Sequence, residues 1–261
     1  MKKFILLCVC VFSVFYGVAH SANVLIVGPS SGAEVTNLRA RLVNAGGTVD
    51  VQAAVPSALS GFQQIWDVRY NTDLSSDQTA YLSYLTSGGS LFLMGENVRF
   101  ATRNNSIKSL LVAAGAGSVG NIVGPSSDTQ VVNAPFNGPT ALSSISYFSC
   151  GALPSGALGT GSSISAASSN GDACAAKWGP GNLANALTGT VVAVYDVNFL
   201  DLMSSSPDFS KFTDNLIAYL ASTSQVGASP AQPIPTLTEW AMIFLASLMA
   251  MFGIRRMRRN K

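Results

Sequence analysis

Histidine is almost missing from this sequence, and charged residues are scarce. Of 261 residues only one is histidine, His20, and Asp, Glu, Lys and Arg together make up 11%. His20 lies within residues 1–21, which we expect to be removed during export. Without that segment the chain has no imidazole. This absence excludes Ser-His-Asp and Cys-His mechanisms and deprives a zinc site of its commonest nitrogen ligand.

The first 21 residues have the three parts of a secretory signal peptide. Lys2 and Lys3 form a basic start, residues 4–18 are apolar, and Ala19-His20-Ser21 offers small residues for cleavage. The alternative is a buried N-terminal helix, but a new strand pattern begins abruptly at Asn23. We therefore expect an exported protein.

Cysteine is rare as well. Two of the four cysteines, Cys8 and Cys10, lie in the expected signal peptide, which leaves Cys150 and Cys174. Export favours an oxidising compartment, so we expect these two to form a disulfide; the alternative is a pair of unrelated small hydrophobic residues. Closing a loop of this length stabilises a fold by about 3–4 kcal/mol.

Basic residues gather at the two ends of the chain. Of fifteen Lys and Arg, only eight lie between residues 22 and 233, together with twelve acids, so this body has a net charge of −4. The body has no stripe or cluster of basic residues. We therefore expect no nucleic-acid partner.

Apolar runs alternate with amphipathic segments along residues 22–221. Expected strands are 22–28, 48–54, 62–71, 90–97 and 189–201, and expected helices are 31–47, 74–89, 104–117 and 207–222, with Ser75 or Ser76 capping the second. This alternation predicts an α/β fold with a mainly parallel sheet and helices on both faces. Residues 120–180, rich in glycine and polar side chains, are predicted to be an irregular or β-rich insertion, and residues 222–233 a linker.

The carboxyl ends of parallel strands meet at one sheet edge, where ligands bind. Three acids are expected there as catalytic candidates: Asp67, Glu96 and Asp196. Four further residues are candidates for ligand binding: Ser30, Arg69, Asn97 and Asn198.

These acids leave three interpretations open. Asp67 and Glu96 could pair with Arg69, Arg99 or Arg103 in a structural role. They could instead line a crevice for a small molecule or glycan, with aromatic side chains for stacking, or work as a general acid and base. The nearby aromatic residues are Trp66, Tyr70, Phe100 and Phe199. Oxygen ligands suit Ca²⁺ or Mg²⁺, but no calcium-loop motif is present, so we expect neither a metal nor a cofactor.

A glycine pattern typical of dinucleotide sites occurs once, as "GAGSVG" from Gly115 to Gly120. That chemistry requires the glycines between a strand and a following helix. Here they follow a predicted helix and precede a strand-like "NIVG". We therefore interpret them as the exit loop of a helix.

The stretch "LFLMGENVRF" places Glu96 in a sharp turn after an apolar strand. With "NVLIVG", the strand–helix order and the closing "VVAVYDVNFLD", the body resembles the class I glutamine amidotransferase-like superfamily, which has a flavodoxin-like fold. The resemblance covers roughly residues 23–221 and rests on pattern. It implies a fold but argues against amidotransferase activity, because Glu96 stands where the family has its cysteine nucleophile and no histidine is left to activate one.

The C-terminal stretch differs from the body. Residues 240–254 are apolar, and as a helix they would extend about 22 Å, short of the ~30 Å hydrocarbon core of a bilayer. Trp240 suits one membrane interface and the arginines from Arg255 onward suit the cytoplasmic one. We expect a transmembrane helix that leaves the body outside the inner membrane.

The order of residues in this tail resembles the IPTL-CTERM relative of PEP-CTERM sorting signals. The residues that carry the resemblance are Ile234, Pro235, Thr236, Leu237, Trp240, Arg255 and Arg256, and Ala241 departs from the family's usual glycine. The resemblance implies sorting of residues 234–261 by an exosortase-type enzyme, cleavage near Pro235-Thr236, and delivery to the cell surface or extracellular matrix. A permanent single-span anchor is the alternative.

From the sequence alone we expect a non-catalytic envelope or matrix protein that binds glycan, such as exopolysaccharide, at the sheet edge. The alternative is a histidine-independent hydrolase that uses Glu96 with Asp67 or Asp196.

Overall fold

The computed structural model describes residues 22–126 and 128–226. The chain divides into two compact units, Met1–Gly227 and Ala228–Lys261. The expected signal peptide and the expected sorting segment both lie outside the described residues. Within the described ranges no helix is both long and apolar enough to cross a bilayer.

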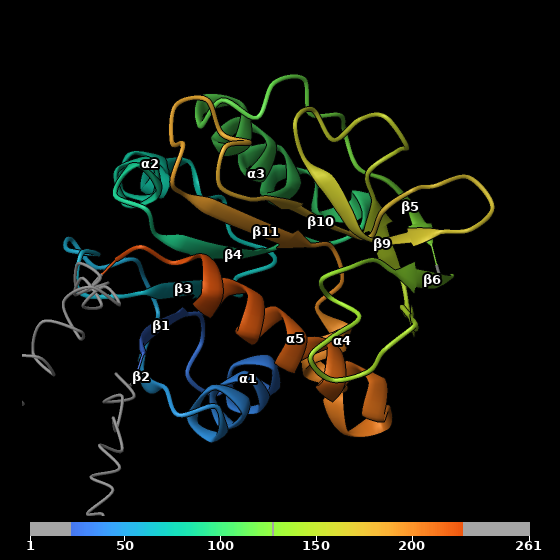
Figure 1. Cartoon of the computed structure of the whole chain (residues 1–261), viewed down its shortest axis with the longest axis horizontal. Coiled ribbons are helices and arrows are strands. Elements are labelled where there is room, and N and C mark those ends of the chain that lie inside the picture. The colour runs from blue at the N-terminus through green and yellow to red at the C-terminus, as the bar shows by residue number, and fades with distance from the viewer. Residues whose placement is uncertain (1–21, 127, 227–261) are drawn as a thin grey trace, which may run out of the picture. The chain divides into compact units, whose positions relative to one another are not determined.

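A nine-stranded sheet forms the centre of the body, in the order β2-β1-β3-β4-β11-β10-β9-β6-β7 (Figure 1). The first five strands in this order are parallel: β2 (Thr48–Gln52), β1 (Asn23–Val27), β3 (Gln64–Asp67), β4 (Ser90–Met94) and β11 (Thr190–Val194). Their order, 2-1-3-4-11, matches the doubly wound arrangement in which a fifth strand follows the fourth. β4 and β11 are buried at every position, as expected for strands covered on both faces.

Helices cover both faces of the parallel half (Figure 1). On one face lie α1 (Ala33–Asn44), α4 (Asn198–Asp201) and α5 (Pro207–Thr223), and on the other α2 (Gln78–Thr86) and α3 (Ala101–Ala113). Short 3-10 turns precede or follow them: η1 (Ser75–Asp77), η2 (Val98–Phe100) and η3 (Met203–Ser205). Alternate residues of β1 enter opposite cores, Ile26 with α1 and α5, and Leu25 with α2 and α3. The predicted α/β class with helices on both faces is confirmed.

The insertion changes the character of the sheet. It contributes β10 (Ala175–Trp178), β9 (Ser162–Ala167), β6 (Thr129–Val132) and β7 (Ser144–Ser146), each antiparallel to its neighbour, so the sheet is mixed rather than mainly parallel. β5 (Val123–Ser126) and β8 (Cys150–Ala152) pair separately in a two-stranded sheet. Residues 120–180 are therefore β-rich, and four of their six strands extend the central sheet beyond β11.

Two local expectations have clear outcomes. Neither Ser75 nor Ser76 caps α2. Instead, one turn earlier, the Asp73 carboxylate accepts hydrogen bonds from the Ser75 amide at 2.8 Å and from the Ser75 hydroxyl at 2.6 Å.

Gly115, in the stretch that resembles a dinucleotide motif, follows α3 with φ +93°, and a Cβ there would lie 2.7 Å from the Ala184 amide nitrogen. That stretch is a helix-exit loop, because only glycine tolerates this conformation so close to another backbone.

Candidate functional site

The carboxyl ends of the five parallel strands form the sheet edge at which the sequence places the candidate residues. Asp67 ends β3, Glu96 lies two residues beyond β4, and Asp196 lies two residues beyond β11. The structure gives these three acids different surroundings. Asp67 is ion-paired, whereas Glu96 and Asp196 face each other.

Asp67 is fully buried in a network of basic and phenolic groups. Its carboxylate accepts hydrogen bonds from Arg69 Nε at 2.9 Å and Nη2 at 2.6 Å, and from Tyr81 Oη at 2.8 Å. Arg103 of α3, also fully buried, lies 3.3 Å from the same carboxylate. Burial alone would raise the pKa of Asp67, but the charges and hydrogen bonds of Arg103, Arg69 and Tyr81 outweigh it and hold that pKa below its usual value. Asp67 is thus an ionised structural residue without a free face for a substrate.

Glu96 and Asp196 lie opposite each other because of strand register. β4 and β11 are paired from Ser90↔Thr190 to Met94↔Val194, and the Gly95 amide continues the ladder to the Val194 carbonyl at 2.8 Å. Glu96 and Asp196 come one residue further along, at neighbouring strand ends, and the charge of Asp196 acts on Glu96. Glu96 is 4% exposed and Asp196 is fully buried.

Backbone and amide groups, rather than arginines, satisfy these two carboxylates. Glu96 accepts hydrogen bonds from the Val197 amide at 3.2 Å and from Asn97 Nδ2 at 2.9 Å. Asp196 accepts from the amides of Asn198 at 2.9 Å and Phe148 at 3.0 Å. None of the salt bridges found within the described residues includes either acid.

The lack of a basic partner leaves burial as the dominant influence on both acids. Burial raises the pKa of Glu96 to about 7, and the nearby charge of Asp196 acts in the same direction. Burial also raises the pKa of Asp196, against the opposing hydrogen bonds from Asn198 and Phe148. We call Glu96 and Asp196 the carboxyl pair.

A segment of the insertion covers the carboxyl pair. This segment, Phe148–Gly151, is called the strap below. Its Phe148 amide binds Asp196, its Ser149 carbonyl accepts from Asn97 Nδ2 at 3.3 Å, and its Gly151 amide donates to the Tyr195 carbonyl at 2.8 Å. A Cβ on Gly151 would lie 2.5 Å from the Glu96 carbonyl oxygen, so glycine permits the close approach.

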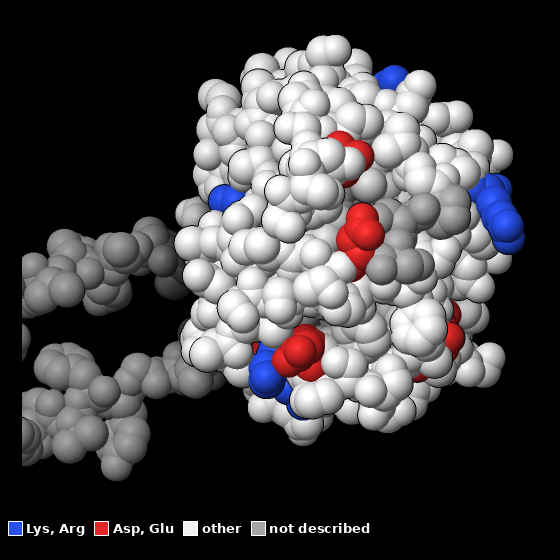
Figure 2. Space-filling view, turned by 90° about the vertical axis from the view of Figure 1, so that its right-hand side faces the viewer, with Lys and Arg blue, Asp and Glu red and all other residues white. Residues whose placement is uncertain are grey.

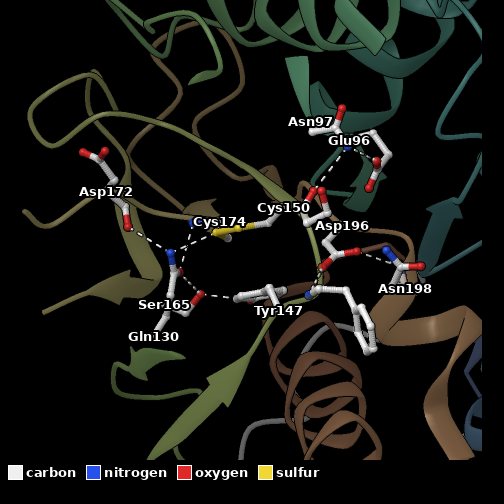
Figure 3. Close-up of a disulfide and its surroundings, with 12 residues drawn as sticks. Glu96, Asn97, Gln130, Tyr147, Cys150, Ser165, Asp172, Cys174, Asp196 and Asn198 are labelled. Atoms are coloured by element: carbon white, nitrogen blue, oxygen red, sulfur yellow. Dashed lines mark hydrogen bonds between the residues drawn. A yellow bond between two sulfur atoms is a disulfide. The ribbon is translucent and has the colours of Figure 1, made fainter. Parts of the chain in front are cut away.

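The predicted disulfide fixes the far end of the strap. Cys150 and Cys174 are bonded, with their Cα atoms 5.8 Å apart, and both are fully buried. Gln130 binds Cys174 and Ser165, and Ser165 in turn lies 2.9 Å from the Tyr147 hydroxyl. Figure 3 shows this network and the disulfide together with the carboxyl pair. The predicted disulfide is confirmed in the structure.

An open crevice lies at the same sheet edge, away from the carboxyl pair. Its volume is about 340 Å³, and it follows the ends of β1, β2 and β3, where the strand order reverses direction. The lining residues are Pro29, Glu34, Ala53, Val68, Arg69, Tyr70, Asn71 and Thr72. Such a reversal is the usual ligand position in doubly wound sheets.

The other sequence candidates occupy several positions along this edge. Ser30 is exposed next to Pro29 of the crevice, whereas Asn97 and Asn198 belong to the surroundings of the carboxyl pair. Of the aromatic candidates, Trp66 and Phe199 are fully buried core residues. Tyr70 and Phe100 are half-buried, and their rings contact edge to face at 5.6 Å.

Sequence reasoning missed Glu34, the one acidic residue that lines the crevice. It lies in the first turn of α1, and its carboxylate folds back over Gly32. Acidic residues in a first helical turn are common for reasons of helix stability alone, so the sequence carries no signal for a site there.

The described residues do not group the side chains that a metal ion needs. They contain no group of three or more His, Cys, Asp or Glu side chains able to hold a metal ion. Figure 2 views the side of the body that carries β5, β6 and β9; on this face charged side chains lie scattered among uncharged ones.

Comparison with known proteins identifies the C-terminal segment. Residues 232–259 match the model of the IPTL-CTERM motif. A search among curated proteins gives no match.

Two solved structures are similar to the body in fold. The N-terminal domain of mmIFT52 matches with a TM-score of 0.57 at 14% identity, over 82% of this chain and all of that domain. A cold-adapted β-galactosidase from Rahnella sp. R3 matches with a TM-score of 0.53 at 14% identity, over 83% of this chain but only 33% of the enzyme. At this identity the likeness extends to fold alone. The chain therefore joins an α/β body of this fold to an IPTL-CTERM sorting signal, the mark of an exported, cell-surface protein.

Proposed function

We propose that the protein is a non-catalytic component of the cell surface or extracellular matrix, delivered by an exosortase-type enzyme, that binds glycan at its sheet edge. The IPTL-CTERM match supports the destination. We also propose that the body is an amidotransferase-like domain without its chemistry, because Glu96 follows the central strand where that family has cysteine.

The surroundings of the three acids argue against hydrolysis. Asp67 is neutralised by Arg69 and Arg103. The carboxyl pair lies beneath the strap, and backbone amides already bind both of its members. A general acid and base must both reach a substrate, and neither arrangement leaves room for one.

The crevice beside Tyr70 is the observation that carries the binding proposal. A sugar ring is recognised by an aromatic face for its C–H groups and by planar polar groups for its hydroxyls. Tyr70 supplies a half-buried ring, Asn71 an amide, and Glu34 a carboxylate, and all three line one cavity of about 340 Å³. The salt bridges of Arg69 with Asp67 and Asp77 hold the backbone that presents Tyr70 and Asn71.

Binding of the exported protein to an array of bacterial exopolysaccharide fragments tests the proposal. We expect saturable binding that Tyr70→Ala abolishes and Tyr70→Phe retains, because stacking needs the ring and not the hydroxyl. Phe148→Ala is the matched control: this ring is 58% exposed but lies outside the crevice, so binding should persist.

Two outcomes would overturn the proposal. An equal loss of saccharide binding in Tyr70→Ala and Phe148→Ala would show non-specific adhesion through exposed rings. Release of shorter saccharides, lost in Glu96→Gln, would instead favour the hydrolase alternative.

A further inference from the structure

The carboxylate of Glu34 is a buried charge to which the body gives no partner. Glu34 is 7% exposed and lines the crevice. Among the described residues its carboxylate takes part in none of the salt bridges and accepts no hydrogen bond. A buried charge in a protein is normally paired with an opposite charge or with a metal ion. The Glu34 carboxylate therefore has an unused capacity to bind a cation.

Arg69 lines the same crevice but does not neutralise Glu34. Its guanidinium binds Asp67 at 2.6 Å and Asp77 at 2.8 Å, and Arg103 lies against Asp67 from the other side. In this network two arginines and two aspartates balance each other. All other residues that line the crevice are uncharged. The crevice therefore presents one uncompensated negative charge to a ligand.

The position of Glu34 also disfavours an anionic ligand. The N-terminus of a helix attracts negative charge, and anions often bind there. Here the chain supplies that charge itself, because Glu34 lies in the first turn of α1 and its carboxylate folds back over Gly32, the residue that precedes the helix. A carboxylate or phosphate of a ligand would meet a like charge at the place where a helix N-terminus would otherwise hold it.

We propose that the crevice selects glycans with a free ammonium group, such as a glucosamine unit, over neutral and acidic glycans. This inference rests on the proposed glycan binding and names its ligand class. The ammonium pairs with the Glu34 carboxylate through charge-assisted hydrogen bonds, and an aromatic face such as that of Tyr70 attracts a cation as well. The side-chain nitrogen of Asn71 donates no hydrogen bond within the described residues, so it is available to a sugar hydroxyl.

Calorimetric titration of the exported protein with three tetrasaccharides of different charge tests the selectivity. The probes are a glucosamine tetramer, the same tetramer after N-acetylation, and a galacturonate tetramer, at about pH 6, where such amines are protonated. The glucosamine tetramer should bind about tenfold to a hundredfold more tightly than the N-acetylated one, the factor expected for a hydrogen bond to a charged group. The galacturonate tetramer should bind most weakly. Added salt should reduce the advantage of glucosamine, which tests the charge pairing without a substitution.

Glu34→Gln removes the charge and keeps the size of the side chain. This variant should lose affinity for the glucosamine tetramer by about the same factor of ten to a hundred, because a neutral amide replaces the charged partner. Asp208→Asn is the matched control. Asp208 also lies in the first turn of a helix, α5, but outside the crevice, so its variant should keep the full preference for glucosamine.

Several results would overturn the selectivity and leave the proposed glycan binding standing. One is equal affinity of the natural protein for the glucosamine and N-acetylated tetramers, or tighter binding of galacturonate. Another is a preference that survives in Glu34→Gln, or one that disappears in Asp208→Asn as well, since it would then come from the overall charge of the body. If no tetramer binds and no saccharide on the array does either, the proposed function itself fails, and the selectivity with it.

Discussion

Asp67→Asn removes one negative charge from the most enclosed ionic network of the body. The change keeps the size of the side chain and leaves Arg69 and Arg103 facing a neutral amide. Arg69 retains a second carboxylate, Asp77, at 2.8 Å. Arg103 retains only carbonyl acceptors, Met94 at 2.8 Å and Thr72 at 3.2 Å. The variant therefore leaves the fully buried guanidinium of Arg103 without an anionic partner.

The size of the effect follows from that burial. Removing one partner of a buried ion pair costs about 3–5 kcal/mol, because the other charge stays desolvated. Since Arg69 keeps Asp77, we expect a loss of about 3 kcal/mol in the free energy of unfolding, a large part of the 5–15 kcal/mol typical of a domain. The comparison is Asp214→Asn, whose pair with Arg41 is about 30% exposed on each side and should contribute at most about 1 kcal/mol.

Urea unfolding at pH 7, followed by circular dichroism, measures both variants. The pKa of Asp67 lies below its ordinary value of 3.8, so its contribution is fully present above that pH and is lost as the pH falls through the folded-state pKa. The difference between natural protein and variant should thus be constant from pH 5 to 8 and shrink only in stronger acid. If Asp67→Asn costs no more than Asp214→Asn, the network is not the buried ion cluster described above.

Two further predictions concern the disulfide and the tail. Replacing Cys150 and Cys174 together by alanine should lower the free energy of unfolding by about 3.5 kcal/mol for a loop that spans 24 positions, measured by the same urea titration; a loss under about 1 kcal/mol would contradict the entropic account. Mass spectrometry of the surface-exposed pool should find a C-terminus near Pro235-Thr236, and an intact Lys261 there would refute processing in favour of a permanent anchor.

The parallel half of the fold was predictable because its signals are local. β1, β4 and β11 are apolar runs that end in glycine or polar residues, and α5 begins at Pro207 with its apolar side chains on one face. The antiparallel half had no such signal. β9 reads "SSISAA", a polar and small-residue sequence with little strand signal. Although β10 is the next strand along the chain, its other partner, β6, lies far earlier in the sequence, and propensity does not record such pairing.

The candidate site was predictable in position and not in contacts. Because the carboxyl ends of parallel strands meet at one sheet edge, the sequence predicted Asp67, Glu96 and Asp196 at neighbouring strand ends. One of the three interpretations, the pairing of Asp67 with arginines such as Arg69 and Arg103, describes Asp67 correctly. Among the described residues no arginine pairs with Glu96, and the strap covers it. Neither feature could be predicted, because the strap belongs to the insertion whose path the sequence left open. The position of Glu34 in the crevice could not be predicted either, because the other residues that line the crevice come from other loops.

The position of β11 in the sheet has a consequence for the order of folding. β11 is the one strand that joins the parallel half, through β4, to the antiparallel half, through β10, yet it is the last strand in the described sequence. Thr190 of β11 pairs with Ser90 of β4, which lies 100 positions earlier in the sequence. The chain therefore loses the conformational entropy of closing a long loop before this contact can form. Without β11 the central sheet would be divided into two parts, with bare edges at β4 and β10. Assembly of the central sheet is thus a late event, completed when Thr190–Val194 inserts between β4 and β10.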